Sequence, residues 1–276
     1  MFLRTVLCSL ALATAGFAQN ADPMRPDPNM PRPIAARDTV WIEEMTWIEV
    51  RDALKSGKRT AIVSTGGVEQ NGPYLAAGKH NYVLRATCEA IARKLGNALV
   101  APIVPFVPEG DISPPTGHML YPSTISVREE TFQRLLTDIA ESLKQHGFQH
   151  VILIGDSGGN TKGMAAVAAA LTRRWGRTAS IHHIPEYYDY ASVKSWLEKQ
   201  GIRQTDEGMH DDFAMSAQMM LIDPTTVRMK ERMAAGKFSI NGVPLAPIQK
   251  TVAWGKRIVD YRAEITVAAI RKAIAR

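Results

Sequence analysis

Short apolar runs and longer amphipathic segments alternate along the chain from Val40 onward. The short runs are apolar almost throughout, which is typical of strands buried on both faces of a parallel sheet, and they lie at residues 60–64, 98–104, 151–154 and 180–184. Apolar residues that recur every three or four positions predict helices at 81–96, 132–143, 159–175, 210–222 and 250–275. This alternation favours an α/β fold with a mostly parallel central sheet covered by helices on both faces.

The first 39 residues depart from this pattern. Residues 1–18 combine Arg4 with an apolar run too short to span a bilayer and a small-residue motif ending at Ala18, which predicts a secretory signal peptide. Residues 19–39 are dense in proline and lack periodicity, which predicts an N-terminal arm. We therefore expect a periplasmic or secreted protein with one α/β domain at 40–276 and no stable membrane insertion.

Composition narrows the chemistry that this domain can carry. The 276 residues are 45% hydrophobic and 22% charged, which suits one compact domain with a substantial core. Only Cys88 remains once a signal peptide is removed, which excludes an internal disulfide and a cysteine-based zinc site. Any metal must therefore be bound by His, Asp or Glu. The net charge of +6 is spread along the chain without a basic cluster, which argues against nucleic-acid binding.

Two loops that follow predicted strands hold the candidate chemistry, because ligands of α/β sheets bind at the carboxyl ends of the strands. The first loop, at 65–81, places Glu69 and His80 around a Gly-Pro turn, which suits a metal site. The second, G-D-S-G-G-N at 155–160, has the letters of the nucleophile loop of chymotrypsin-like proteases and also fits the G-x-S-x-G elbow of α/β-hydrolases. The α/β pattern argues against the all-β protease, so Ser157 is a candidate nucleophile only as a hydrolase elbow.

Four ordered segments resemble the creatininase (creatinine amidohydrolase) family. The first loop, G-G-V-E-Q-N-G-P-Y-L, resembles that family's G-x-x-E-Q-H-G-P-H-L, and H-G-F-Q-H-V-I-L-I-G-D-S-G-G-N resembles its H-G-F…N-G-H-G-G-N segment. Y-P-S-T resembles its F-P-G-T, and E-G-M-H-D-D-F-A-M-S resembles its G-x-H-A-x-x-x-E-T-S. The chain is therefore identified as a divergent, exported member. The resemblance implies a three-layer α/β/α fold, metal-dependent hydrolysis of a C–N bond in a cyclic or linear amide, and a homo-oligomer.

The resemblance also implies a pair of divalent ions, whose ligand positions are substituted here. Glu69 keeps its place, whereas Asn71 replaces a histidine, His80 replaces a bridging aspartate and Ser157 replaces another histidine. A neutral imidazole has one free lone pair and cannot bridge two ions. Gly159 stands where some members carry an acid. We therefore expect about one ion per chain, Zn or Mn, by ordinary ligand chemistry.

We assign roles to these residues as follows. The metal ligands are expected to be Glu69, His80 and Asp156. His210 is expected to protonate the leaving nitrogen, with Asp211 or Asp212 tuning its pKa. The backbone of Gly158 and Gly159 would face the developing oxyanion. The full set expected to contact a small-molecule amide substrate is Asn71, Tyr74, His118, Ser157, Gly158, Gly159 and Asn160.

Two alternatives stay open at this point. In the first, the substituted ligands leave no metal, and the protein binds a ligand in the family's pocket without hydrolysing it. In the second, Ser157 is an elbow nucleophile and His210 is its base, which respects the serine-then-histidine order of α/β-hydrolases. The ligand positions and the metal content of the protein discriminate between them.

Overall fold

The computed structural model describes residues 24–275, so the expected signal peptide at 1–18 lies outside the described residues. The chain divides after Ala35 into two compact units. The described part of the first, 24–35, forms turns and bends without a helix or strand. The second unit, from Ala36 onward, contains every helix and strand of the described residues, and the fold below is that of this unit.

Four parallel strands form the central sheet in the order β2-β1-β3-β4. The strands are β1 (Thr60–Thr65), β2 (Ala98–Val100), β3 (His150–Gly155) and β4 (Ser180–His183). The two central strands, β1 and β3, pair along six residues each, and every residue of β1 is buried. Burial on both faces explains why these segments are apolar without polar alternation.

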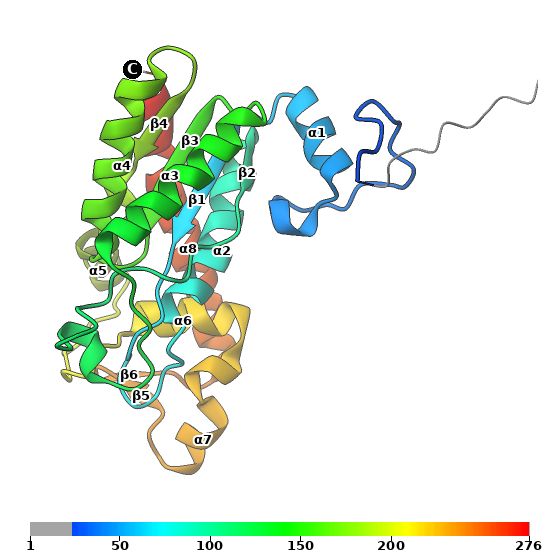
Figure 1. The fold of residues 1–276 in the computed structure, drawn as a ribbon. Helices are drawn as coiled ribbons and strands as arrows, with labels where there is room; N and C mark the ends of the chain where they lie inside the picture. The colour runs from blue at the N-terminus through cyan, green and yellow to red at the C-terminus, as the bar shows by residue number, and fades with distance from the viewer. Residues whose placement is uncertain (1–23, 276) are drawn as a thin grey trace, which may run out of the picture. The chain divides into compact units, whose positions relative to one another are not determined.

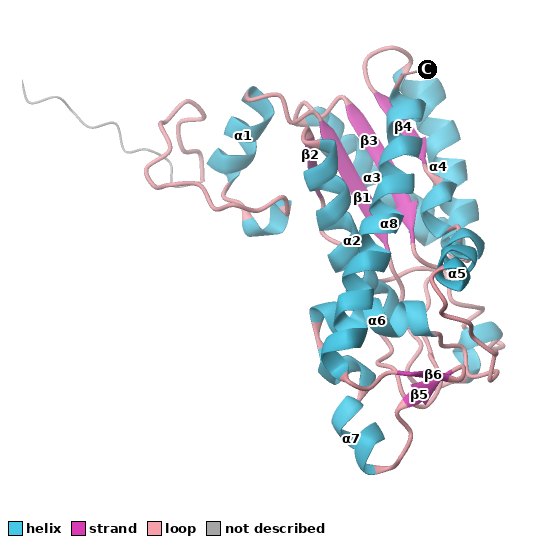
Figure 2. Ribbon diagram, turned by 180° about the vertical axis from the view of Figure 1, so that it is seen from behind, coloured by secondary structure: helices cyan, strands magenta, loops and turns pink. Residues whose placement is uncertain are grey.

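Helices cover both faces of this sheet and make it the middle of three layers. On one face, Ile62 and Ile152 pack against α2 (Lys79–Leu95) and α8 (Ile248–Ile274), which lie in front of the sheet in Figure 2. On the other face, their neighbours pack against α3 (Glu129–Gln145) and α4 (Asn160–Trp175), as Figure 1 shows. Successive strand residues point to opposite faces, so both cores come from the same strands. The predicted three-layer α/β/α fold is confirmed.

The remaining elements flank the sheet or extend beyond the carboxyl ends of its strands. Helix α1 (Trp47–Lys55) packs Leu54 near the sheet edge, and α6 (Phe213–Ile222) packs against α8 and α2. The others are α5 (Tyr190–Lys199), α7 (Met229–Ala234), the hairpin of β5 (Ser239–Ile240) and β6 (Val243–Pro244), and the short 3₁₀ helices η1 (Ile42–Glu44), η2 (Gly117–Leu120), η3 (Pro185–Tyr188) and η4 (Pro224–Val227). None of the helices in residues 24–275 combines the length and the apolar character that a bilayer span requires.

Two boundaries differ from the prediction, for local reasons. The second strand ends at Val100 because Pro102 has no N–H to donate to a ladder; Val104 then makes an isolated bridge with Thr65. Helix α6 begins at Phe213, where the Asp212 side chain accepts from the Met215 N–H at 2.6 Å and caps the helix. The segment that carries His210 is therefore a loop and not the start of a helix.

Candidate functional site

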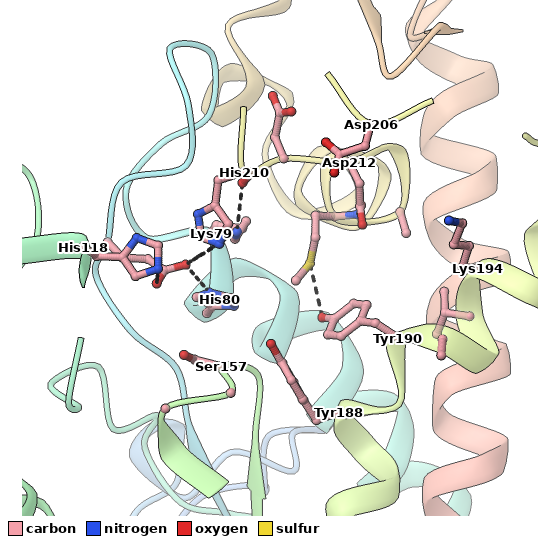
Figure 3. A pocket seen from close by; sticks show the side chains of 18 of the residues that line it. Lys79, His80, His118, Ser157, Tyr188, Tyr190, Lys194, Asp206, His210 and Asp212 are labelled. Atoms are coloured by element: carbon pink, nitrogen blue, oxygen red, sulfur yellow. Dashed lines mark hydrogen bonds and ion pairs between the residues drawn. The ribbon is translucent and has the colours of Figure 1, made fainter. Parts of the chain in front are cut away.

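A cavity of about 1000 Å³ lies at the carboxyl ends of β1 and β3. Its walls come from the loop after β1, the first turn of α2, the 108–118 segment, the loop after β3, α5 and the 204–215 segment. Figure 3 shows His118, His210, Lys79 and His80 gathered on one side of this cavity, with Lys194 on the far side. The two loops singled out in the sequence thus meet in one place.

His80 lies in this wall between two buried carboxylates. Its Nδ1 lies 2.9 Å from Asp156 Oδ2, and its Nε2 lies 2.7 Å from Glu69 Oε1. Burial acts to lower the pKa of His80, but the hydrogen bonds to Asp156 and Glu69 outweigh it and raise that pKa. His80 is therefore held as an imidazolium that donates from both nitrogens, and neither nitrogen has a free lone pair for an ion.

Asp156 is held at the other end of this hydrogen-bonded row. Its Oδ1 accepts from the Tyr190 hydroxyl at 2.7 Å and from Arg262 Nη2 at 2.8 Å, and its Oδ2 faces His80. Burial acts to raise the pKa of Asp156, but the charges and hydrogen bonds of Arg262 and His80 together lower it. The three predicted ligands Glu69, His80 and Asp156 are thus brought together, as an ion-paired row in which Asp156 braces His80.

A different trio places its ligand atoms around one point. The nearest available atoms of Glu69, His118 and His210 all lie within 4.8 Å of one another. His118 Nε2 is 3.3 Å from Glu69 Oε2, and His210 Nε2 is 3.8 Å from Glu69 Oε1. The two imidazole rings stack with centroids 4.5 Å apart. Two imidazoles and a carboxylate form a ligand set suited to Zn²⁺ or Mn²⁺.

Local backbone structure aims both imidazoles at Glu69. His210 has a left-handed conformation with φ of 56°, and its Nδ1 lies 2.9 Å from the Gln70 carbonyl. If Nδ1–H donates to that carbonyl, the Nε2 lone pair is left facing Glu69, the usual arrangement of a ligating histidine. His118 lies in η2, where the Thr124 hydroxyl donates to its carbonyl at 2.7 Å. The loop at Gly72 packs closely against the backbone next to His210. A Cβ at Gly72 would lie 2.3 Å from the Met209 carbonyl oxygen, so this close packing requires glycine.

The pKa shifts of Glu69 and His210 favour the forms that bind a divalent ion. Burial would raise the pKa of Glu69, but the hydrogen bond and charge of His80 outweigh it and hold that pKa below its usual value. Burial and the Lys79 charge lower the pKa of His210. An anionic carboxylate and a neutral imidazole are the forms that bind a metal.

The described residues do not fit a second ion at the other substituted positions. Asn71 is buried, and its Nδ2 donates to the carbonyls of Glu69, Ala76 and Ala77 at 2.9, 3.2 and 3.3 Å. It therefore braces the loop. Gly159 has no side chain to offer, and a Cβ there would lie 2.7 Å from the Pro108 carbonyl oxygen.

The structure adds two cavity residues that the sequence reasoning missed. Glu109 is buried, and burial together with the charge of Glu69 raises its pKa to about 9, so it carries a proton at neutral pH. Its Oε1 has no hydrogen-bond partner within residues 24–275. Lys79, next to His80, is 3% exposed and lies near Glu69. A single Glu after prolines and a single Lys at a helix start carry no spacing signal that could have singled them out.

The predicted role of Asp211 is not supported by a contact with His210. Both Asp211 carboxylate oxygens are buried without a hydrogen-bond partner in the described chain, and burial raises the pKa of Asp211 to about 6. The Gln70 carbonyl orients the His210 ring instead. Both Asp211 and His210 line the cavity.

The residues expected to contact substrate fall into two groups. His118, Ser157, Gly158 and Gly159 line the cavity. Asn71, Tyr74 and Asn160 are not among its described lining residues. Tyr74 stacks under the Arg232 guanidinium at 4.3 Å, and Asn160 Nδ2 donates to the Thr65 and Gly66 carbonyls at 3.1 and 2.9 Å. These contacts fix the loops, although Oδ1 of Asn160 has no hydrogen-bond partner within residues 24–275.

The geometry does not provide Ser157 with a base. Both His80 nitrogens face carboxylates, and the His210 nitrogens face the Gln70 carbonyl and Glu69. A serine nucleophile needs an imidazole within hydrogen-bonding reach. Ser157 is buried and lines the cavity without such a partner among residues 24–275.

Comparison with known proteins gives a consistent result. The creatininase family model, described as creatinine amidohydrolase, matches residues 43–270. A creatinine amidohydrolase of Pseudomonas putida is 25% identical over 116 residues, which are 42% of this chain and 44% of that protein. The match thus spans less than half of that relative's length.

Solved structures share the fold over most of the chain. A manganese form of creatininase superposes with a TM-score of 0.58 at 19% identity, covering 86% of this chain and 97% of the other. A mutant creatininase of the Zn–Zn type superposes with a TM-score of 0.56 at 19% identity, covering 86% and 98%. At this identity the likeness establishes the fold.

Proposed function

This chain belongs to the creatininase family, and we propose that it is a metal-dependent amidohydrolase that cleaves the C–N bond of a cyclic or linear amide. One observation supports this most strongly: Glu69, His118 and His210 bring three ligand atoms within 4.8 Å of one another in the wall of a large cavity. We propose that these three residues hold one divalent ion, Zn or Mn.

Residues around this trio take separate roles in the proposed amide hydrolysis. Glu69, His118 and His210 would hold a divalent ion, which would supply Lewis-acid chemistry for activating water and polarising the amide carbonyl. His80, fixed by Asp156, orients Glu69 through the 2.7 Å hydrogen bond to Oε1. Glu109 lines the same cavity and carries a proton at neutral pH, so its carboxyl group is our candidate to pass a proton to the leaving nitrogen.

The experiment that tests the proposal combines metal content with hydrolysis. We expect the purified protein to contain about one Zn or Mn per chain, in line with a three-ligand site. Release of amine from a panel of cyclic and linear amides should stop on chelation and return when the metal is restored. His118→Ala should lose metal and activity together, whereas His146→Ala, at an exposed position after α3, should keep both. Activity that persists in metal-free protein would contradict the proposal.

A second candidate function is ligand binding without hydrolysis. It is favoured by the cations already present: Lys79 and His80 lie against Glu69, and Arg262 lies against Asp156. These side chains offset both carboxylates without an ion. Protein that purifies free of metal, rejects added Zn and Mn, and still binds small amides would favour this function.

Location and assembly are further parts of the proposal. The signal-like segment at 1–18 supports export to the periplasm or beyond. A homo-oligomer is supported by large apolar side chains that are exposed in the segment after β2: Phe106, Ile112, Leu120, Tyr121 and Ile125. Fractionation of the host cell tests the first point. Light scattering tests the second, and the mass of a single chain would contradict it.

A further inference from the structure

Lys79 is a buried ammonium whose hydrogen bonds are incomplete. It is 3% exposed, yet its Nζ lies 3.4 Å from the His210 carbonyl oxygen and 3.6 Å from Glu69 Oε1. Both separations exceed the usual ~2.7–3.2 Å of an N–H···O hydrogen bond. An ammonium has three N–H donors and is costly to bury without acceptors. Because Lys79 lines the cavity, a ligand there can supply the acceptor.

The surroundings of Lys79 favour an acceptor with negative charge. Lys79 is the first residue of α2, a 17-residue helix, and Gly158 and Gly159, which directly precede α4, line the same cavity. Neither helix has a side-chain cap at its N-terminus. Helix N-termini carry partial positive charge. The Lys79 ammonium and the N-termini of α2 and α4 therefore make this part of the cavity wall electropositive.

This electropositive part of the wall lies beside the candidate metal ligands. Lys79 Nζ and His210 Nε2 lie 3.6 and 3.8 Å from the same oxygen, Glu69 Oε1. An amide whose carbonyl carbon is approached by water at the trio would place its oxygen within the same small volume. Asn71 Nδ2 is engaged by loop carbonyls and Gly159 has no side chain, and both nitrogens of His80 face carboxylates. Lys79 is therefore the cation beside Glu69 that keeps N–H donors for that oxygen.

We propose that Lys79 is a catalytic residue whose Nζ–H donates to the carbonyl oxygen of the scissile amide and stabilises the negative charge that develops there. The proposal rests on the proposed amide hydrolysis. Water adds to the carbonyl carbon, and the C=O π pair moves to the oxygen that Lys79 holds. The pair returns as the C–N bond breaks, the nitrogen leaves with a proton from Glu109, a proton of the water replaces it on Glu109, and the products are an acid and an amine. No oxidant or reductant takes part.

The kinetic test compares two lysines of helix α2. Lys79→Met should lower kcat by about 10²–10³-fold with little change in KM, as loss of an oxyanion donor does. Lys79→Arg, which keeps the charge, should recover part of that loss. Lys94→Met is the matched control, because Lys94 forms an ion pair of similar length, 3.5 Å to Glu264, at the exposed end of the same helix. Equal effects of the Lys79 and Lys94 variants, or a change in KM alone, would overturn the proposal.

A binding test separates this proposal from the metal site. Methylphosphonate, a tetrahedral anion, and acetate, a planar anion, are titrated by calorimetry into metal-loaded and metal-stripped protein. We expect Lys79→Met to weaken methylphosphonate about tenfold or more in both forms, and acetate much less, because only the tetrahedral probe mimics the addition step. Lys79→Gln provides the same test if the methionine variant fails to fold.

The outcomes distinguish the two proposals. Wild-type protein that rejects added Zn and Mn and hydrolyses no amide would contradict the proposed function, yet methylphosphonate binding would still report on Lys79. If wild-type protein does not bind methylphosphonate, or if both Lys79 variants bind it as wild type does, Lys79 has no role as an anion donor. If Lys79→Met weakens acetate binding as strongly as methylphosphonate binding, Lys79 holds a permanent carboxylate of the ligand, and the oxyanion role is overturned.

Discussion

The two ends of the central sheet carry histidines in opposite electrostatic settings. At the carboxyl end, His80 lies between the carboxylates of Glu69 and Asp156, and its pKa is raised. At the amino end, His150 Nδ1 and His182 Nε2 lie 2.8 and 3.0 Å from one hydroxyl, that of Ser180. Burial lowers the pKa of both His150 and His182.

Burial acts in the same direction at both ends, so the partners make the difference. A carboxylate stabilises an imidazolium, whereas a neutral hydroxyl does not offset the loss of water. The carboxyl end therefore contains a buried series of ion pairs that links Glu69, His80, Asp156 and Arg262 in that order. That end also has the cavity, which is where ligands of α/β sheets bind.

The largest expected effect is on stability at the charged end. Asp156→Asn leaves Arg262, whose side chain is 1% exposed, without its ionic partner. Breaking a buried pair in this way costs about 3–5 kcal/mol of unfolding free energy. Urea denaturation measures the loss. Asp260→Asn is the matched control, because its ion pair with Lys256 is solvent-exposed and worth about 0–1 kcal/mol. Similar losses of unfolding free energy in both variants would show that the buried ion pair stabilises the protein no more than the exposed one.

The next effect concerns metal affinity. His118→Ala should weaken Zn²⁺ or Mn²⁺ binding by more than the ~10–100-fold typical of losing an outer-shell partner. His150→Ala, which removes an imidazole from the neutral end, should leave affinity unchanged. Calorimetric titration of both variants provides the comparison. A wild-type affinity in His118→Ala would remove His118 from the ligand set.

Ser157 should matter much less than its motif suggests. Ser157→Ala should keep the hydrolysis rate within about fivefold of wild type, because no imidazole reaches its hydroxyl. A serine-directed phosphonate should fail to label the protein. Loss of ~10³-fold or more, with labelling at Ser157, would restore the nucleophile hypothesis.

The smallest effect is the pH dependence of the neutral end. The folded pKa values of His150 and His182 lie below the unfolded value of about 6.5, so the unfolded state binds more protons as the pH falls. Their contribution is complete above that value and is lost as the pH falls through the folded values. Exposure limits the effect to about 1 kcal/mol or less. Urea denaturation at pH 7.5 and 5.0 should show a smaller loss in His150→Asn than in wild type; an equal loss would contradict this assignment.

The fold could be predicted because periodicity reports burial directly. Residues such as Ile62 and Val63 are both apolar because helices cover both faces of β1. The strand after α2 was predicted too long because a local apolar run does not reveal where Pro102 ends a ladder. Family resemblance placed Glu69 and the loop after β3 at the same site.

The use of each side chain at the site could not be predicted in the same way. His80 looked like a ligand, but a side chain 76 residues away takes one of its nitrogens. Arg262 lies 106 residues from Asp156, so no local sequence pattern shows that the two side chains form an ion pair. His118 and His210 meet only through tertiary packing. Sequence spacing shows which groups are near a strand end, and not which partner satisfies each of them.

We propose that Glu69, His118 and His210 hold one ion in this site. Anomalous diffraction from crystals of the protein grown with Mn²⁺ or Zn²⁺ tests this proposal most directly. We expect a single peak per chain, about 2.0–2.2 Å from a Glu69 oxygen and from Nε2 of both histidines. A peak between Glu69 and Asp156 on a rotated His80, or two peaks sharing Glu69, would contradict it.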